Sequence, residues 1–143
     1  MRSAPAPRPK FDERRVLQIA VAIAACVPVT AGLAGVAFGP SVFDSGVYGV
    51  SLDSHVRYLS GLLLGLGLAF WSFIPRIESA TKPARILTLM VFIGGIARLL
   101  SLALHGAPSA GMLFGLGMEL VVTPLLCLWQ GRVARIAGSG PAI

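Results

Sequence analysis

The chain has 143 residues, of which 55% are hydrophobic and 13% are charged, and its formal net charge is +6. Soluble domains carry about 25% charged residues, and a domain of this length cannot bury so large an apolar fraction. These values argue against a soluble globular enzyme and against a disordered chain, and they predict an integral membrane protein.

Long apolar stretches predict an all-α fold, an integral membrane four-helix bundle. Val16–Phe43 and Tyr58–Pro75 carry no charge, and each can hold a helix of about 20 residues, which crosses a hydrocarbon layer of about 30 Å. Two further apolar stretches each contain one ionisable residue within the span. The apolar runs are continuous and not alternating, so they do not fit the strands of a β-barrel. The predicted elements, in chain order, are a flexible basic tail over 1–15, a transmembrane domain over 16–131 with helices at about 16–38, 54–74, 85–104 and 109–130, and a short tail over 132–143.

The first predicted helix also resembles a secretion signal, because a charged stretch precedes an apolar run. The uncharged run Val16–Phe43 is longer than a typical signal core of about 7–15 residues. We therefore expect a retained helix.

Basic residues outside the predicted helices all fall on one side of the membrane, and the 39–53 loop has none. By the positive-inside rule, both termini are expected in the cytoplasm of a bacterial cell, with the protein in the cytoplasmic membrane. The basic excess thus orients the chain in a lipid bilayer, and we expect no nucleic-acid partner. These residues are Arg2, Arg8, Lys10, Arg14, Arg15, Arg76, Lys82, Arg85, Arg132 and Arg135.

The second and fourth predicted helices share a pattern. Residues 60–68 and 110–118 are identical at five of nine positions, at an offset of 50. A duplicated helix pair explains the match, and so does convergence on Gly-x-x-x-Gly, which brings membrane helices close together.

Three charged residues lie inside the predicted spans: Arg57, Arg98 and Glu119. Each costs about 2.5–3.5 kcal/mol at a helix centre, so each is expected to face the protein interior. Helical spacing places them on stripes with small residues, which predicts that these stripes are the packed faces. The predicted packing glycines are Gly61, Gly65, Gly94, Gly111 and Gly115.

We expect Arg98 and Glu119 to form an ion pair, with Arg57 nearer the outer mouth of the bundle. Either Asp44 or Asp53 can reach Arg57 from the outer loop. The candidate ligand-binding site or buried polar cluster is thus Arg57, Arg98, Glu119 and His105. A polar clamp that fixes helix register and a site for a lipid or quinone-like ligand are both open readings.

The sequence offers few other residues that could bind a metal, form a disulfide or catalyse a reaction. His55 and His105 lie near the outer ends of their helices without the spacing of a known metal site, so no metal is expected. Cys26 and Cys127 are predicted at different depths, too far apart for a disulfide. No catalytic residues and no cofactor are expected.

The segments Arg57-Tyr58-Leu59-Ser60-Gly61, 95–101, 105–108 and Glu119-Leu120 carry a family resemblance. The chain resembles a bacterial family of small four-helix membrane proteins labelled as a domain of unknown function, which is similar to the DoxX/DoxD-like group. The resemblance implies a four-helix bundle with Arg57, Arg98, Gly106 and Glu119 at motif positions. The wider group includes members associated with quinone-linked oxidoreductases, which is an analogy of fold alone.

These features favour a binding or accessory subunit without enzymatic activity. Its expected partners are the lipid bilayer, a lipid or quinone-like ligand, and a larger membrane complex or a homo-oligomer. The alternative is a small membrane enzyme or carrier for a hydrophobic substrate, with Glu119 as proton donor or acceptor. A proton-coupled transporter ranks last, because the inner half of the bundle lacks ionisable residues.

Overall fold

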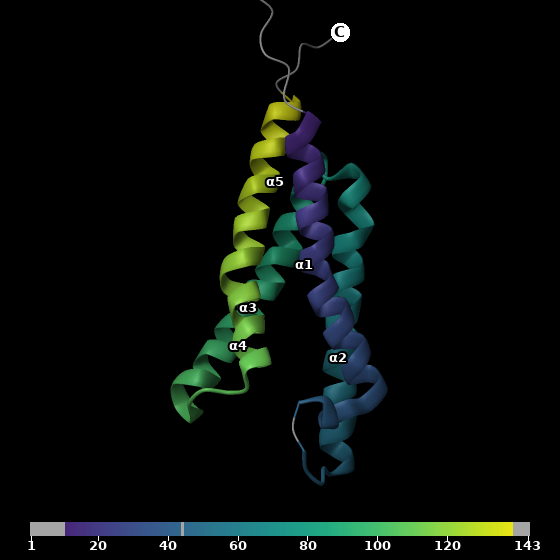
Figure 1. Ribbon diagram of the computed structural model, residues 1–143, viewed down its shortest axis with the longest axis vertical. Coiled ribbons are helices and arrows are strands. Elements are labelled where there is room, and N and C mark those ends of the chain that lie inside the picture. Colours follow the sequence, from purple (N-terminus) through teal and green to yellow (C-terminus); the bar gives the residue numbers. More distant parts are fainter. Residues whose placement is uncertain (1–10, 44, 139–143) are drawn as a thin grey trace, which may run out of the picture.

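The computed structural model describes residues 11–43 and 45–138, and these residues form four long helices (Figure 1). Each of the four is long and apolar enough to cross a membrane. The fourth is continuous but contains a π-helical turn. The elements are α1 (Phe11–Phe38), η1 (Gly39–Val42), α2 (Val50–Phe73), η2 (Ile74–Arg76), α3 (Thr81–His105), α4 (Ala110–Gly117), η3 (Met118–Val122) and α5 (Thr123–Gly138).

Small residues bring α1 and α2 into close contact along their length. A Cβ atom on Gly32 would lie 2.6 Å from the backbone nitrogen of Leu64, and one on Gly67 would lie 2.6 Å from Cγ2 of Val29. Gly35 faces Ser60 in the same way, and Ser60 is buried. Backbones that approach this closely gain van der Waals contact, which is the main attraction between helices in lipid.

The core lies at the end of the bundle where α1 begins and α5 ends, which we call the closed end. Leu17 of α1 and Ile77, which follows η2, are fully buried there and pack with Val133 of α5. Toward η1 and the α3–α4 turn, which we call the open end, the α1–α2 pair diverges from α3 and α4 (Figure 1). The bundle is therefore joined most tightly at one end.

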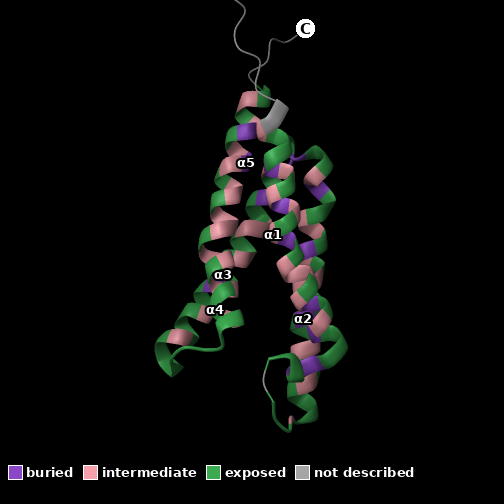
Figure 2. Ribbon diagram, in the orientation of Figure 1, coloured by how far each residue is buried: buried purple, intermediate pink, exposed green. Residues whose placement is uncertain are grey.

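Most apolar side chains of the four helices are exposed on the outside of the bundle (Figure 2). In the most apolar window of the helix Ala110–Gly138, no residue is buried within the chain. Exposed apolar surface on this scale requires a lipid environment. The chain is thus a multi-pass membrane protein with an all-α, four-helix fold.

The helices extend beyond their predicted bounds, and the tails are shorter than expected. Residues 1–10 and 139–143 lie outside the described part, but 11–15 belong to α1 and 132–138 belong to α5. An ion pair lies in each extension: Arg14 pairs with Glu78 at 2.8 Å, and Arg132 pairs with Glu13 at 3.2 Å. Charged residues near the membrane surface thus continue the helices rather than end them.

The α3 helix starts at Thr81 and not at about 85, so Pro83 lies within its first turn. Proline is tolerated there, since the amide group that it lacks would have no partner within the helix. The α2 helix likewise starts at Val50 and not at about 54.

Candidate ligand-binding cavity

A cavity of about 620 Å³ lies between the helices. This volume is within the range of about 300–1,000 Å³ of small-molecule sites. Its walls come from all four long helices and are mostly aliphatic, with Pro28, Leu63, Leu87, Met118 and Leu126 as examples. The cavity reaches from the closed end to the middle of α3, so it can hold an elongated apolar molecule.

Arg98 of α3 and Glu119 of η3 form an ion pair in the wall of this cavity. The Nε atom of Arg98 lies 3.1 Å from Oε1 of Glu119, which confirms the predicted pairing. Its Nη1 donates to Sδ of Met112 in α4 at 2.8 Å. The side chain of Arg98 is 39% exposed and that of Glu119 is 17% exposed. The second carboxylate oxygen of Glu119, Oε2, is buried without a hydrogen-bond partner in the described chain.

A π-helical turn carries Glu119. It spans Met118–Val122 and precedes Pro124, whose ring nitrogen cannot donate to the carbonyl of Leu120. The hydroxyl of Thr123 donates to the carbonyl of Met118 at 2.8 Å. Such turns are frequent at functional sites because they re-aim one side chain within an otherwise regular helix.

Gly95 allows α3 to approach this turn. A Cβ atom there would lie 2.6 Å from Cδ2 of Leu120 and 3.0 Å from Cβ of Glu119. Gly95 was not among the glycines predicted to pack helices, although its position beside Gly94, three residues before Arg98, was a sequence signal for such a role. The close approach places the ion pair between two nearly touching helices.

Gln130 of α5 supplies a polar group at the closed end of the cavity and was also missed from the sequence. It is 2% exposed, and its Nε2 donates to the carbonyl of Ile77 at 2.7 Å and to Oγ1 of Thr81 at 3.2 Å. Its Oε1 is buried and has no hydrogen-bond partner among the described residues. An amide inside an apolar helix was the sequence signal for this residue.

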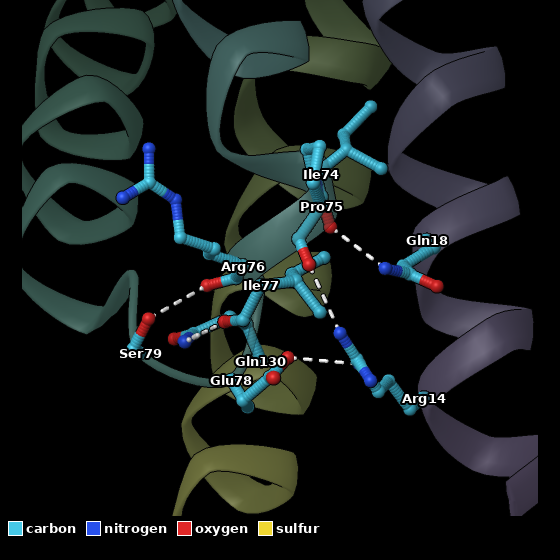
Figure 3. A network of polar contacts seen from close by, with 9 residues as sticks. All are labelled: Arg14, Gln18, Ile74, Pro75, Arg76, Ile77, Glu78, Ser79 and Gln130. Atoms are coloured by element: carbon cyan, nitrogen blue, oxygen red, sulfur yellow. Dashed lines mark hydrogen bonds and ion pairs between the residues drawn. The ribbon is translucent and has the colours of Figure 1, made fainter.

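Gln130 belongs to a network that holds the turn between α2 and α3 (Figure 3). From α1, Gln18 donates to the carbonyl of Ile74 at 2.8 Å, and Arg14 donates to that of Pro75 at 2.9 Å. The turn carbonyls, which no helix satisfies, thus bond to side chains of α1 and α5. This network fixes the closed end of the cavity.

Arg57 does not join the Arg98–Glu119 pair, and the expected cluster of four residues is therefore divided. Its Nε lies 2.8 Å from Oδ2 of Asp53, and its Nη1 donates to the carbonyls of Val36 and Ala37 at the end of α1. Arg57 is absent from the cavity wall, because it turns toward α1 rather than α3. The other expected partner, Asp44, lies outside the described residues.

His105 lies at the end of α3, where its side chain is exposed and outside the cavity wall. It therefore belongs to the open end and not to the site around Arg98. Cys26 and Cys127 are free thiols, as their predicted depths indicated.

The glycines predicted to pack one helix against another do not make close contacts between helices. A Cβ atom on Gly65, Gly94 or Gly115 would meet no atom of the described chain within 4 Å, and these three glycines line the cavity. Gly111 is also open, and Gly61 makes only ordinary contact, 4.0 Å from Val36. The stripes on α2, α3 and α4 thus leave space in the bundle, while Gly32, Gly35, Gly67 and Gly95 make the close contacts.

The fold and the cavity together define a small multi-pass membrane protein whose four helices border an apolar cavity with an ion pair in its wall. The chain belongs to the family described as Domain of unknown function (DUF4345), whose model matches residues 16–130. The expected membership in a family of unknown function is thereby confirmed. No curated protein and no solved structure matches the chain.

Proposed function

We propose that this protein binds an apolar or amphipathic ligand, a lipid or a quinone-like molecule, inside its bundle. The observation that carries the proposal is the cavity of about 620 Å³, walled mostly by aliphatic side chains and containing the Arg98–Glu119 pair. Apolar pockets with a few convergent polar groups are typical of small-molecule sites. The resemblance to DoxX-like proteins that we expect from the sequence motifs would favour a quinone-like ligand, by analogy alone.

The membrane in this proposal is the bacterial cytoplasmic membrane, with both termini inside. Support comes from the lysine and arginine side chains, because every described one other than Arg57 and Arg98 lies toward the closed end, on α1, η2, the start of α3 or α5. Charge of this sign at the cytoplasmic surface also attracts anionic lipid head groups.

Arg57 serves a structural role in this proposal. Its contacts with Asp53 and with the last carbonyls of α1 tie α1 to α2 at the open end. The exposed apolar faces are also compatible with an accessory role, in which the protein packs against a larger membrane complex or a second copy of itself.

The test fills the cavity without altering its polar groups. Gly115→Leu places a side chain in the cavity, while Gly111→Leu, one turn earlier on α4, places the same side chain outside it. A Cβ atom at either position would meet no atom of the described chain within 4 Å. Both variants and the unaltered protein are purified in a mild detergent, and co-purified lipids and quinones are measured by mass spectrometry. We expect a bound species that Gly115→Leu loses and Gly111→Leu retains. Equal amounts in all three would contradict the proposal.

A second candidate is a carrier or enzyme that moves a proton through Glu119. The buried Oε2 of Glu119 favours it, because Glu119 lines the cavity and this oxygen has no hydrogen-bond partner among the described residues. Glu119→Gln removes the proton site and keeps the shape. Turnover or transport of a co-purified molecule that survives this substitution would eliminate the second candidate.

A further inference from the structure

Two buried side-chain oxygens on residues that line the cavity have no hydrogen-bond partner among the described residues, and both are acceptors. They are Oε2 of Glu119 and Oε1 of Gln130, and both residues line the same cavity. A buried acceptor without a partner costs about 1–3 kcal/mol. A ligand that brings a donor therefore gains more in this cavity than one that brings only acceptors.

The charge in the cavity wall is already balanced. Arg98 faces Oε1 of Glu119 and also donates to Met112, so the guanidinium has partners on two sides. An anionic head group near Arg98 would also meet the carboxylate of Glu119. A neutral head group avoids that repulsion, because a close like charge is unfavourable in a medium of low dielectric constant.

From these observations we infer that the cavity selects a neutral apolar alcohol, whose hydroxyl donates to Oε2 of Glu119 while its hydrocarbon body fills the aliphatic chamber. The inference rests on the proposed binding function and specifies the chemical class of the ligand. Hydrogen bonds to charged groups are worth about 1.5–3 kcal/mol, which corresponds to at least a tenfold preference over a molecule without the donor.

Three probes with the same hydrocarbon chain separate the alternatives: dodecanol, dodecyl methyl ether and dodecanoate. Dodecanol offers a donor, the ether offers only an acceptor, and dodecanoate offers a negative charge. Binding of each to the full chain is measured by equilibrium dialysis of detergent-solubilised protein, with protein-free micelles as the blank. We expect dodecanol to bind at least about tenfold more tightly than the ether and more tightly than dodecanoate.

In the Glu119→Gln variant we expect the preference between the neutral and the negatively charged head group to reverse, because Arg98 loses its counter-ion. We expect this variant to bind dodecanoate more tightly than dodecanol. Asp53→Asn is the matched control, since it removes the carboxylate partner of Arg57, which lies outside the cavity wall, and the order of the three probes should not change.

The outcomes separate the two proposals. If the unaltered protein binds all three probes with equal affinity, or dodecanoate most tightly, the inference about the head group is wrong while the apolar cavity remains a binding site. If no probe binds above the blank, the proposed binding function itself fails. Because the main comparison uses the unaltered chain, it holds even if Glu119→Gln does not fold.

Discussion

The side-chain amide of Gln130 in α5 donates a 2.7 Å hydrogen bond to the backbone carbonyl of Ile77, 53 residues earlier in the chain. This bond joins the last helix to the turn between α2 and α3. Both partners are almost completely buried. The closed end of the bundle therefore depends on polar contacts to turn carbonyls as well as on the apolar core around Leu17.

Gln130→Leu should lower the free energy of unfolding by about 0.5–1.5 kcal/mol, because it removes the 2.7 Å bond to the buried carbonyl of Ile77 and leaves that carbonyl only the longer, 3.4 Å bond from the amide of Ala80. Gln18→Leu is the matched control, since Gln18 donates to the carbonyl of Ile74 in the same turn but is only partly buried. The measurement is unfolding by detergent titration in mixed micelles. A loss for Gln18→Leu that equals or exceeds that for Gln130→Leu would contradict the ranking.

Breaking the Arg98–Glu119 pair should destabilise the protein, and exchanging the two residues should restore part of the loss. We expect each single alanine variant to lose about 1–3 kcal/mol, less than a fully buried pair would, because Arg98 is 39% exposed. The yield of folded monodisperse protein and its unfolding midpoint are the readouts. An exchanged double variant no better than the singles would argue against direct pairing.

The two sets of glycines should respond in opposite ways to alanine. Gly32→Ala forces a Cβ atom to 2.6 Å from backbone nitrogen of Leu64 and should cost about 1–3 kcal/mol. Gly94→Ala meets no atom within 4 Å and should stabilise α3 by up to about 1 kcal/mol through helix propensity. Unfolding curves recorded under identical conditions test this pair. Equal losses would mean that the space beside Gly94 is filled in the membrane.

The proposed orientation can be tested with single cysteines. Ser79→Cys reports on the α2–α3 turn and Ser109→Cys on the α3–α4 turn, each in a background without Cys26 and Cys127. Both serines are exposed, and they lie at opposite ends of the bundle. With both termini in the cytoplasm, a membrane-impermeant maleimide should label Ser109→Cys in intact cells and Ser79→Cys only after permeabilisation. The reverse pattern would invert the topology.

Hydropathy and charge were sufficient to predict four membrane-spanning helices and their all-α class. The pairing of Arg98 with Glu119 was also predictable, because charges inside apolar helices need partners and each sat at a compatible depth. Helix ends were less accurate, since charged residues such as Arg14 continue α1 by pairing across the bundle.

The position of Arg57 nearer the outer mouth and its pairing with Asp53, one of two expected partners, were predicted, but its bonds to the end of α1 were not. Spacing tells which residues share a face of one helix, but not which neighbour that face meets. Arg57 turns to α1, and the glycines Gly65, Gly94 and Gly115 border a cavity rather than another backbone. The π-helical turn at Glu119 likewise depends on how Pro124 is accommodated within a packed helix.

The divergence of the α1–α2 pair from α3 and α4 has a consequence for how the cavity fills. If the protein binds an apolar ligand as proposed, that ligand would enter from the bilayer between the two helix pairs without passing through water. Occupancy would then follow the mole fraction of the ligand among the surrounding lipids, not its aqueous concentration. A change in membrane composition would be sufficient to load or empty the protein.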